Sequence, residues 1–302
     1  MYDIIIIGGG AAGMTAALYS LRSGKSVLLL EKETIGGQIA NSPRVENFPS
    51  IKEIAGNEFS DNLFDQILSL GAEFELDNVT GIEKVNNTFV VKAEYNTYES
   101  KAIILATGLK HRKINIPNED ELIGKGVSYC AVCDGAFYKD EDVCLVGDGN
   151  TALQYALLLS NYCKKVYLCT LFDKFFGDLT LVDRIKARNN IEIIHNVSLK
   201  EFLFNDELYG LKFENTIDKS DLEINAKGCF IAIGQVPNNE MFKNLVDLDD
   251  RGYFIVNNDL ATKTPGVFVA GDCRQKKIRQ LTTAVADGAI ASVGAVAYID
   301  SL

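Results

Sequence analysis

The chain is short of positive charge, and this excludes one large class of function. Its 302 residues carry 30 lysines and arginines against 41 aspartates and glutamates, a formal net charge of −11. A general nucleic-acid-binding protein needs a cationic surface to displace counterions from the phosphates. The balance therefore predicts no nucleic-acid partner, and an acidic protein partner would need a local basic patch.

Long apolar runs are also scarce. Asp3 stands beside a run of only four isoleucines with no basic region before it, which is not the pattern of a signal peptide. The longest apolar stretch, residues 284–299, is shorter than a membrane span and contains Asp287. We therefore expect a cytoplasmic protein with no membrane partner.

Cysteine and histidine are few as well. Seven cysteines are too few for the disulfide scaffold of a secreted protein. The two histidines, His111 and His195, do not stand at ligand spacing, so the sequence predicts no metal site. Four of the cysteines have the apolar or helical surroundings of small core residues: Cys144, Cys163, Cys169 and Cys229.

The residues that are present indicate two similar domains. At roughly 150 residues per domain, the length corresponds to about two. Residues 2–31 have the pattern strand, glycine-rich turn, helix, strand, and residues 142–170 repeat it at the length of half a dinucleotide-binding fold. We expect an α/β fold with two doubly wound dinucleotide-binding (Rossmann-like) domains, the second inserted into the first. The first would comprise residues 1–113 and 240–302, and the second residues 114–239.

The first glycine-rich turn matches G-x-G-x-x-G between a strand and a helix. Gly8 would make the tight turn, Gly10 would let the backbone approach a pyrophosphate, and Gly13 would let helix and strand pack closely. The helix N-terminus would offer unpaired N–H groups to the phosphates, and Glu31 could accept hydrogen bonds from a ribose. The turn predicts adenine-dinucleotide binding without separating NAD from FAD. The expected contacts are Gly8, Gly10, Ala11, Ala12, Gly13 and Glu31.

Cys130 and Cys133 form a C-x-x-C pair, which in a cytosolic α/β protein is a redox motif or half a zinc site. Zinc needs four ligands, and the sequence contains no second such pair. Two unrelated core cysteines are the remaining alternative. A dithiol at this spacing can close a short disulfide, and the adjacent Asp134 is a candidate proton donor for its exchange.

Residues 128–138, Ser-Tyr-Cys-Ala-Val-Cys-Asp-Gly-Ala-Phe-Tyr, resemble the low-molecular-weight thioredoxin reductase family, and the likeness covers nearly the whole chain. The resemblance implies FAD in the first domain, a homodimer and thioredoxin as the partner. It implies that Cys133 faces the flavin, that Cys130 attacks the thioredoxin disulfide and that Asp134 moves protons. It adds a further set of FAD contacts: Gly37, Gln38, Asn47, Ala106, Thr107, Gly108, Gly271, Asp272, Arg279, Gln280 and Leu281.

The second glycine-rich turn, residues 147–152, keeps the family's scaffold but lacks its NADPH recognition residues. Members of the family end the next strand with His-Arg-Arg and place another Arg four residues on. Here those positions read Thr170-Leu171-Phe172 and Phe176. A 2′-phosphate needs a cation, preferably a guanidinium, and no carboxylate stands at the strand end to select NADH.

We therefore expect electrons to enter without a pyridine nucleotide. The sequence is most similar to the family's ferredoxin-dependent branch, whose acidic donor could dock on the basic runs at residues 110–113 and 274–279. The alternatives are an NAD(P)H-dependent thioredoxin reductase, with Lys174 or Arg184 binding the phosphate, and a non-catalytic flavin-binding redox sensor. A different disulfide protein could also replace thioredoxin as the substrate.

Overall fold

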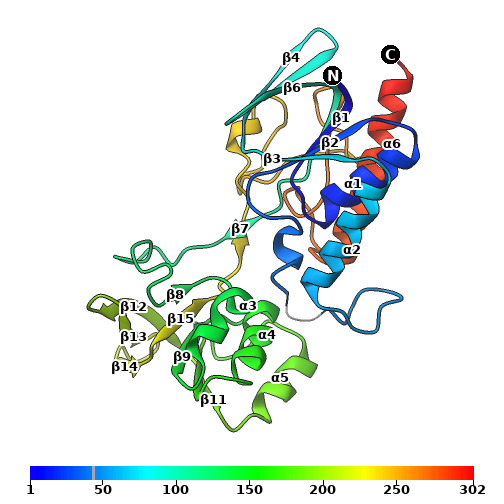
Figure 1. Ribbon diagram of the computed structural model, residues 1–302. Coiled ribbons are helices and arrows are strands. Elements are labelled where there is room, and N and C mark those ends of the chain that lie inside the picture. Colours follow the sequence, from blue (N-terminus) through cyan, green and yellow to red (C-terminus); the bar gives the residue numbers. More distant parts are fainter. Residues whose placement is uncertain (43–44) are drawn as a thin grey trace. The chain divides into compact units, whose positions relative to one another are not determined.

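The computed structural model describes residues 1–42 and 45–302 (Figure 1). The chain forms two compact units, Met1–Lys110 with Pro237–Leu302, and His111–Val236. The chain passes between them twice, and at these crossings β7 (Lys110–His111) pairs with β16 (Gln235–Val236). The second unit is therefore an insertion in the first.

Among the described residues, the first unit contains a seven-stranded sheet in the order β3-β2-β1-β6-β5-β4, with β17 beside β6. Ile7 pairs with Leu30 on one side and Leu105 on the other, and Val269 also pairs with Leu105, all in parallel. Four strands therefore end together at one edge. The strands are β1 (Tyr2–Ile7), β2 (Val27–Glu31), β3 (Glu73–Leu76), β4 (Val79–Val85), β5 (Thr88–Ala93), β6 (Thr97–Leu105) and β17 (Val267–Val269).

Three helices cover one face of this sheet, and α1 lies beside both of the others (Figure 1). They are α1 (Ala11–Arg22), α2 (Gly56–Ser69) and α6 (Leu281–Asp300). Small residues bring α6 close to α1, since a Cβ at Gly288 would lie 2.2 Å from the Ala12 carbonyl oxygen. By length and composition α6 could cross a membrane, but a third of that stretch is buried, and a core helix meets the same criterion.

The second unit, all of which the structure describes, has a five-stranded parallel sheet in the order β11-β10-β9-β15-β8. Its strands are β8 (Val127–Ser128), β9 (Asp142–Val146), β10 (Lys165–Cys169), β11 (Ile191–Ile194) and β15 (Gly228–Ile231). Alternate side chains face opposite layers: Val143 and Leu145 pack on the helices, whereas Cys144 lies in the opposite core. The helical elements are α3 (Ala131–Asp134), η2 (Gly135–Tyr138), α4 (Asn150–Leu159) and α5 (Leu179–Lys186).

The opposite layer is a three-stranded antiparallel sheet, β12-β13-β14, which the sequence analysis missed. Its strands are β12 (Val197–Phe204), β13 (Leu208–Asn215) and β14 (Asp221–Asn225). In β13, Leu211 and Phe213 are buried while Lys212 between them is exposed, an alternation that could have revealed the strand. The predicted fold class, α/β with two Rossmann-like domains, is confirmed.

Candidate active site

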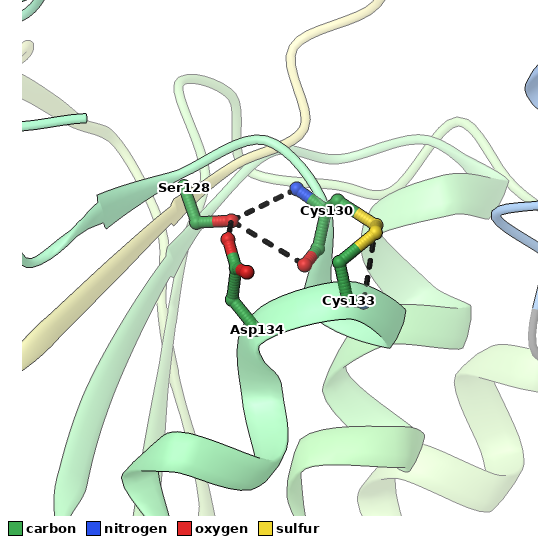
Figure 2. The surroundings of a disulfide bond; sticks show 4 residues. All are labelled: Ser128, Cys130, Cys133 and Asp134. Carbon is green, nitrogen blue, oxygen red and sulfur yellow. Dashed lines mark hydrogen bonds between the residues drawn. A yellow bond between two sulfur atoms is a disulfide. The ribbon is translucent and has the colours of Figure 1, made fainter. Parts of the chain in front are cut away.

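The C-x-x-C pair is a disulfide at the start of a short helix (Figure 2). Cys130 follows β8 with an extended backbone, and α3 begins at the next residue. One turn of helix brings Cys133 back beside Cys130, with Cα atoms 5.3 Å and sulfur atoms 2.10 Å apart. The Cys133 N–H donates to Cys130 Sγ at 3.1 Å. Cys133 is exposed and Cys130 half-buried, so a partner can reach the bond.

A serine that the sequence analysis did not single out joins this disulfide to Asp134. Ser128 Oγ donates to Asp134 Oδ2 at 2.6 Å and accepts the Cys130 N–H at 3.0 Å. It also lies 3.3 Å from the Cys130 carbonyl oxygen. Figure 2 shows Ser128, at the end of β8, pointing between the cysteine backbone and the carboxylate. The signal available in the sequence was a hydroxyl two residues before the first cysteine.

The residue between Ser128 and Cys130 is also fixed. Tyr129 donates its phenol proton to buried Glu119, which accepts the backbone N–H groups of Ile114 and Asn115 at 2.9 and 2.6 Å. Burial and the Glu119 carboxylate raise the pKa of Tyr129 far above its usual value. His111 stacks on the Tyr129 ring, with centroids 5.6 Å apart. The chain segment entering the disulfide is therefore held rigidly.

The first glycine-rich turn fits a dinucleotide. Gly8 has φ +111°, and a Cβ there would lie 2.2 Å from the Ala106 carbonyl oxygen. A Cβ at Gly13 would lie 1.9 Å from the Gly8 carbonyl oxygen, so helix and strand require both glycines. Gly10 is different, because its Cβ would meet nothing nearer than 3.9 Å. Its open surface faces the side where a pyrophosphate would approach the N-terminus of α1.

Glu31 is held against this turn. Its Oε2 accepts the Gly9 N–H at 2.7 Å, and its Oε1 accepts the N–H groups of Lys32 and Glu33 at 2.9 Å. Backbone donors therefore orient the carboxylate, and the free lone pairs of its two oxygens can accept hydrogen bonds from a ribose.

Other predicted FAD contacts also gather near the ends of β6 and β17. Asn47 Nδ2 donates to Gln280 Oε1 at 3.2 Å, and Gln280 caps α6 together with Thr283. Thr107 Oγ1 donates to Asn239 Oδ1 at 2.9 Å, and Gln38 Nε2 donates to the Leu109 carbonyl oxygen at 3.2 Å. Most of the remaining residues of the set lie in the same turns: Ala11 and Ala12 open α1, Gly37 opens η1 (Gly37–Ile39), Ala106 and Gly108 follow β6, Gly271 follows β17, and Leu281 opens α6.

Asp272 lies in a network of charges. Its Oδ1 is buried and accepts no hydrogen bond from the described residues, although Lys276 Nζ lies 3.1 Å away. Lys276 also binds Asp287 of α6 at 3.0 Å, and Arg274 binds the same carboxylate through two bonds of 2.8 Å. Burial acts to raise the pKa of Asp287, but Arg274 and Lys276 outweigh it and hold that pKa below its usual value. Asp272 Oδ1 is paired with the Lys276 ammonium and has lone pairs left to accept a hydroxyl donor such as a ribityl chain.

The same network removes most of one expected docking surface. The basic run at residues 274–279 was predicted as a cationic patch, but the Lys276 side chain is only 6% exposed and both it and Arg274 are internally paired. Arg279 stacks over Tyr253 at 4.2 Å. Lys277 is the charge of this run that remains exposed, because Asp287 binds Arg274 and Lys276 while Arg279 donates to the carbonyl oxygens of Asp272 and Arg274. At residues 110–113, Lys113 pairs with Asp120, while Lys110 and Arg112 are exposed.

The glycine-rich turn of the second unit borders a cavity of about 200 Å³ beside the N-terminus of α4. Gly147 is constrained, since a Cβ there would lie 2.3 Å from the Ala232 carbonyl oxygen, whereas nothing lies within 4 Å of a Cβ at Gly149. Burial raises the pKa of Asp148 in this turn. The cavity is lined by His111, Tyr129, residues 148–151 and residues 231–235.

The end of β10, where a 2′-phosphate would bind, presents apolar side chains. Leu171, Phe172 and Phe176 are 48, 49 and 57% exposed, and the two aromatic rings pack edge to face, with centroids 5.4 Å apart. Lys174 lies over the Phe176 ring at 5.2 Å. Thr170 Oγ1 bonds the Phe172 carbonyl oxygen and His195 Nδ1, each at 2.7 Å. The strand end thus lacks the arginine pair that the resemblance leads one to expect for binding a 2′-phosphate.

Comparison with known proteins agrees with this arrangement. Residues 2–288 match the family described as pyridine nucleotide-disulphide oxidoreductase. The chain is 38% identical to the thioredoxin reductase of Listeria monocytogenes over 303 residues, covering 100% of this chain and 95% of that protein. The crystal structure of Lactococcus lactis thioredoxin reductase has a TM-score of 0.96 and 37% identity, covering both chains completely.

A ferredoxin-flavin thioredoxin reductase from Clostridium acetobutylicum is more distant, with a TM-score of 0.55, 27% identity, and coverage of 100% of this chain and 99% of that one. The relatives of higher identity are named simply thioredoxin reductases, so the likeness supports that group without singling out its ferredoxin-dependent branch. The matched family and its thioredoxin reductases depend on FAD, which the geometry of the first unit also fits. The chain belongs to the pyridine nucleotide-disulphide oxidoreductase family and is a flavoprotein whose cofactor is FAD.

Proposed function

We propose that this protein is a thioredoxin reductase that takes its electrons from reduced ferredoxin. The observation that carries the reductase proposal is the accessible Cys130–Cys133 disulfide with a hydrogen-bonded carboxylate one residue beyond it. The 37–38% identity to thioredoxin reductases over the whole chain supports the substrate class. The unit comprising residues 1–113 and 240–302 would bind FAD, and residues 114–239 would carry the dithiol. We also propose a homodimer, on the family likeness.

FAD, when bound, supplies the electron pair that opens the Cys130–Cys133 disulfide. In the outgoing step the Cys130 thiolate attacks one sulfur of the thioredoxin disulfide, forming a mixed disulfide and releasing one thioredoxin thiolate. The Cys133 thiolate then attacks Cys130 Sγ, which closes the enzyme disulfide and releases the second thiolate. The two protons lost by the cysteines are the two that thioredoxin gains, and Asp134 passes them on.

Replacing Cys130 or Cys133 by Ser tests this assignment. Each change should abolish thioredoxin reduction under any electron donor, because a single thiol cannot close the enzyme disulfide. Flavin absorbance should persist, since neither residue belongs to the FAD set. If the wild-type protein binds FAD yet reduces neither thioredoxin nor another disulfide protein, the redox-sensor alternative replaces the reductase proposal.

The electron donor is the finer part of the proposal, and the apolar end of β10 supports it. Two charge-assisted hydrogen bonds contribute about 1.5–3 kcal/mol each, so their absence would weaken NADPH binding by roughly a hundredfold or more. Asp148 adds a carboxylate beside the position of the pyrophosphate, where its ionised form would repel the phosphates. Both effects act against a phosphorylated nicotinamide and leave a protein donor unaffected.

The NAD(P)H-dependent alternative has its own support, namely the open Gly149 and the description of the matched family, which names a pyridine nucleotide. Anaerobic mixing of the oxidised holoprotein with NADPH, NADH or reduced ferredoxin separates the two. We expect rapid flavin bleaching with ferredoxin alone. Bleaching by a nicotinamide at a comparable rate would establish the alternative.

A further inference from the structure

The hydroxyl of Ser128 has one hydrogen to donate and three polar neighbours. The Cys130 N–H, 3.0 Å away, can only donate to it. Asp134 Oδ2 at 2.6 Å and the Cys130 carbonyl oxygen at 3.3 Å can each accept its proton. Ser128 is only 3% exposed, so solvent has little access to replace any of these partners. The single hydroxyl hydrogen of Ser128 can therefore bond only one of these two acceptors at a time.

Which oxygen accepts the Ser128 hydrogen depends on the charge of Asp134. When the carboxylate is ionised, Ser128 donates to it, because hydrogen bonds to charged acceptors are the stronger ones. When the carboxyl is protonated, its own O–H can donate to Ser128 Oγ, and the serine hydrogen turns to the Cys130 carbonyl oxygen. Ser128 then accepts two bonds and donates one, which uses its full capacity. Neither state leaves a buried polar group without a partner.

Two phenols packed around α3 have pKa values raised above the usual value and stay protonated. Tyr138 of η2 faces Asp134, and burial, then Asp134 and Glu207, raise its pKa. Tyr162, whose hydroxyl would lie 2.6 Å from a Cβ at Gly135, also has its pKa raised by burial. Cys229 of β15 is a fully buried thiol near Tyr138.

We propose that Ser128 is a positioning residue that lets Asp134 gain and lose a proton at the dithiol without moving. The inference rests on the proposed disulfide exchange. Asp134 accepts the proton that the Cys130 thiol loses as its sulfur attacks the partner disulfide, and the Ser128 hydrogen swings to the Cys130 carbonyl oxygen. The proton then passes from Asp134 to the departing partner thiolate, and the Ser128 hydrogen returns. No electron is transferred to or from the serine.

The test measures exchange between the prereduced holoprotein and oxidised thioredoxin from pH 5 to 9.5, with a small aromatic disulfide as a second substrate. Ser128→Ala should slow exchange with both roughly ten- to a hundredfold. The pH dependence of its exchange rate should move upward by about one pH unit, because the ionised Asp134 carboxylate loses a hydrogen-bond donor. Ser128→Thr, which keeps the hydroxyl, should restore both the rate and the profile.

Two further variants separate the role of Ser128 from a general loss of folding. Ser160→Ala removes another buried serine of the same unit, whose hydroxyl donates only to the Leu157 carbonyl oxygen, and should leave rate and profile unchanged. Ser128→Ala combined with Asp134→Asn should be no slower than Asp134→Asn alone, since the two residues act as one.

The outcomes distinguish the inference from the proposed function. If Cys130→Ser abolishes exchange but Ser128→Ala keeps the wild-type pH profile, Ser128 is only structural and the inference is wrong. If the exchange rate of the double variant falls by the product of the two single-variant reductions, the residues act independently and the inference is also wrong. If the wild-type prereduced protein exchanges with neither disulfide, the proposed function fails and the inference fails with it.

Discussion

The two glycine-rich turns have the same backbone but different surroundings. The residues before α1 and α4, Gly10 and Gly149, have (φ, ψ) of (−78°, −178°) and (−95°, −179°), and a Cβ on either would meet no atom nearer than 3.9 Å. The first turn is accompanied by Glu31, held by three backbone N–H groups, and by the buried Asp272 oxygen. The second has Asp148 beside it and apolar side chains at the next strand end. The same backbone shape can thus stand beside very different side chains.

The largest expected effect is on the stability of the first unit and concerns Asp287, the buried carboxylate that binds Arg274 and Lys276. Asp287→Asn should destabilise that unit by about 3–5 kcal/mol at pH 7, because Arg274 and Lys276 keep their charges without a buried counter-ion. The folded-state pKa of Asp287 is lowered, so its contribution is present above the unfolded pKa of about 3.9 and is lost as the pH falls through the folded value. The difference between wild type and variant in denaturant unfolding should therefore shrink below about pH 4.

Asp300→Asn is the matched control. Asp300 pairs with Lys25 near the end of the same helix, but its side chain is 59% exposed. This exposed pair should contribute less than about 1 kcal/mol. Equal losses from both substitutions would show that the buried network does not stabilise the first unit in the way described.

Matched substitutions at the two open glycines sharpen the comparison directly. Gly10→Val should leave the apoprotein folded but weaken FAD binding by roughly a hundredfold or more, because the side chain would occupy the path of the pyrophosphate. Gly149→Val should leave FAD binding and ferredoxin-driven turnover unchanged. FAD titration of the apoproteins by flavin fluorescence, together with turnover assays, measures both. Loss of ferredoxin-driven turnover in Gly149→Val would mean that the second turn still holds a needed ligand.

Placing positive charge at the end of β10 should give the second unit part of the NADPH binding that we propose it lacks. Leu171→Arg combined with Phe172→Arg places guanidinium groups where two exposed apolar side chains now lie. NADPH-driven flavin bleaching should rise roughly ten- to a hundredfold, with a smaller gain for NADH, which lacks the 2′-phosphate. Leu171→Gln with Phe172→Gln controls for polarity alone. An equal gain for both nicotinamides would argue against phosphate recognition at this position.

The smallest expected effect is that of Asp148→Asn. Burial raises the pKa of Asp148, so its ionised form costs the folded state stability at pH 7, and that cost disappears when the group is protonated in acid. The variant should gain less than about 1 kcal/mol at pH 7 and nothing below about pH 3. A thermal unfolding series across this range checks the sign.

The sequence predicted the fold class and the redox pair well because both depend on short-range patterns. The glycine spacing at residues 8–13 recurs as a short motif, although Gly8 is constrained by Ala106 after a distant strand, and Cys130 and Cys133 lie within one turn of helix. The pairing within the basic run at residues 274–279 could not be predicted, because it depends on Asp287. Composition counts charges but cannot tell which of them a distant helix will pair.

Ser128 shows a different limit. Its partners, Cys130 and Asp134, lie only two and six residues away, yet its role depends on the angle at which β8 passes into α3. A serine in a short strand is ordinary by sequence alone, so the pattern gave no reason to select it. The sheet β12-β13-β14 is the opposite case. Its alternation of buried and exposed residues is present in the sequence, so the pattern was sufficient to predict these strands.

The most direct test is anaerobic flavin reduction followed by absorbance, with one sample of the oxidised protein divided among NADPH, NADH and reduced ferredoxin. The account predicts full bleaching by ferredoxin, a rate at least a hundredfold lower with NADPH, and slow bleaching with NADH, because no carboxylate at the end of β10 binds its ribose. Fast bleaching by NADPH, with a phosphate-dependent preference over NADH, would contradict the claim that the second unit has lost its nucleotide.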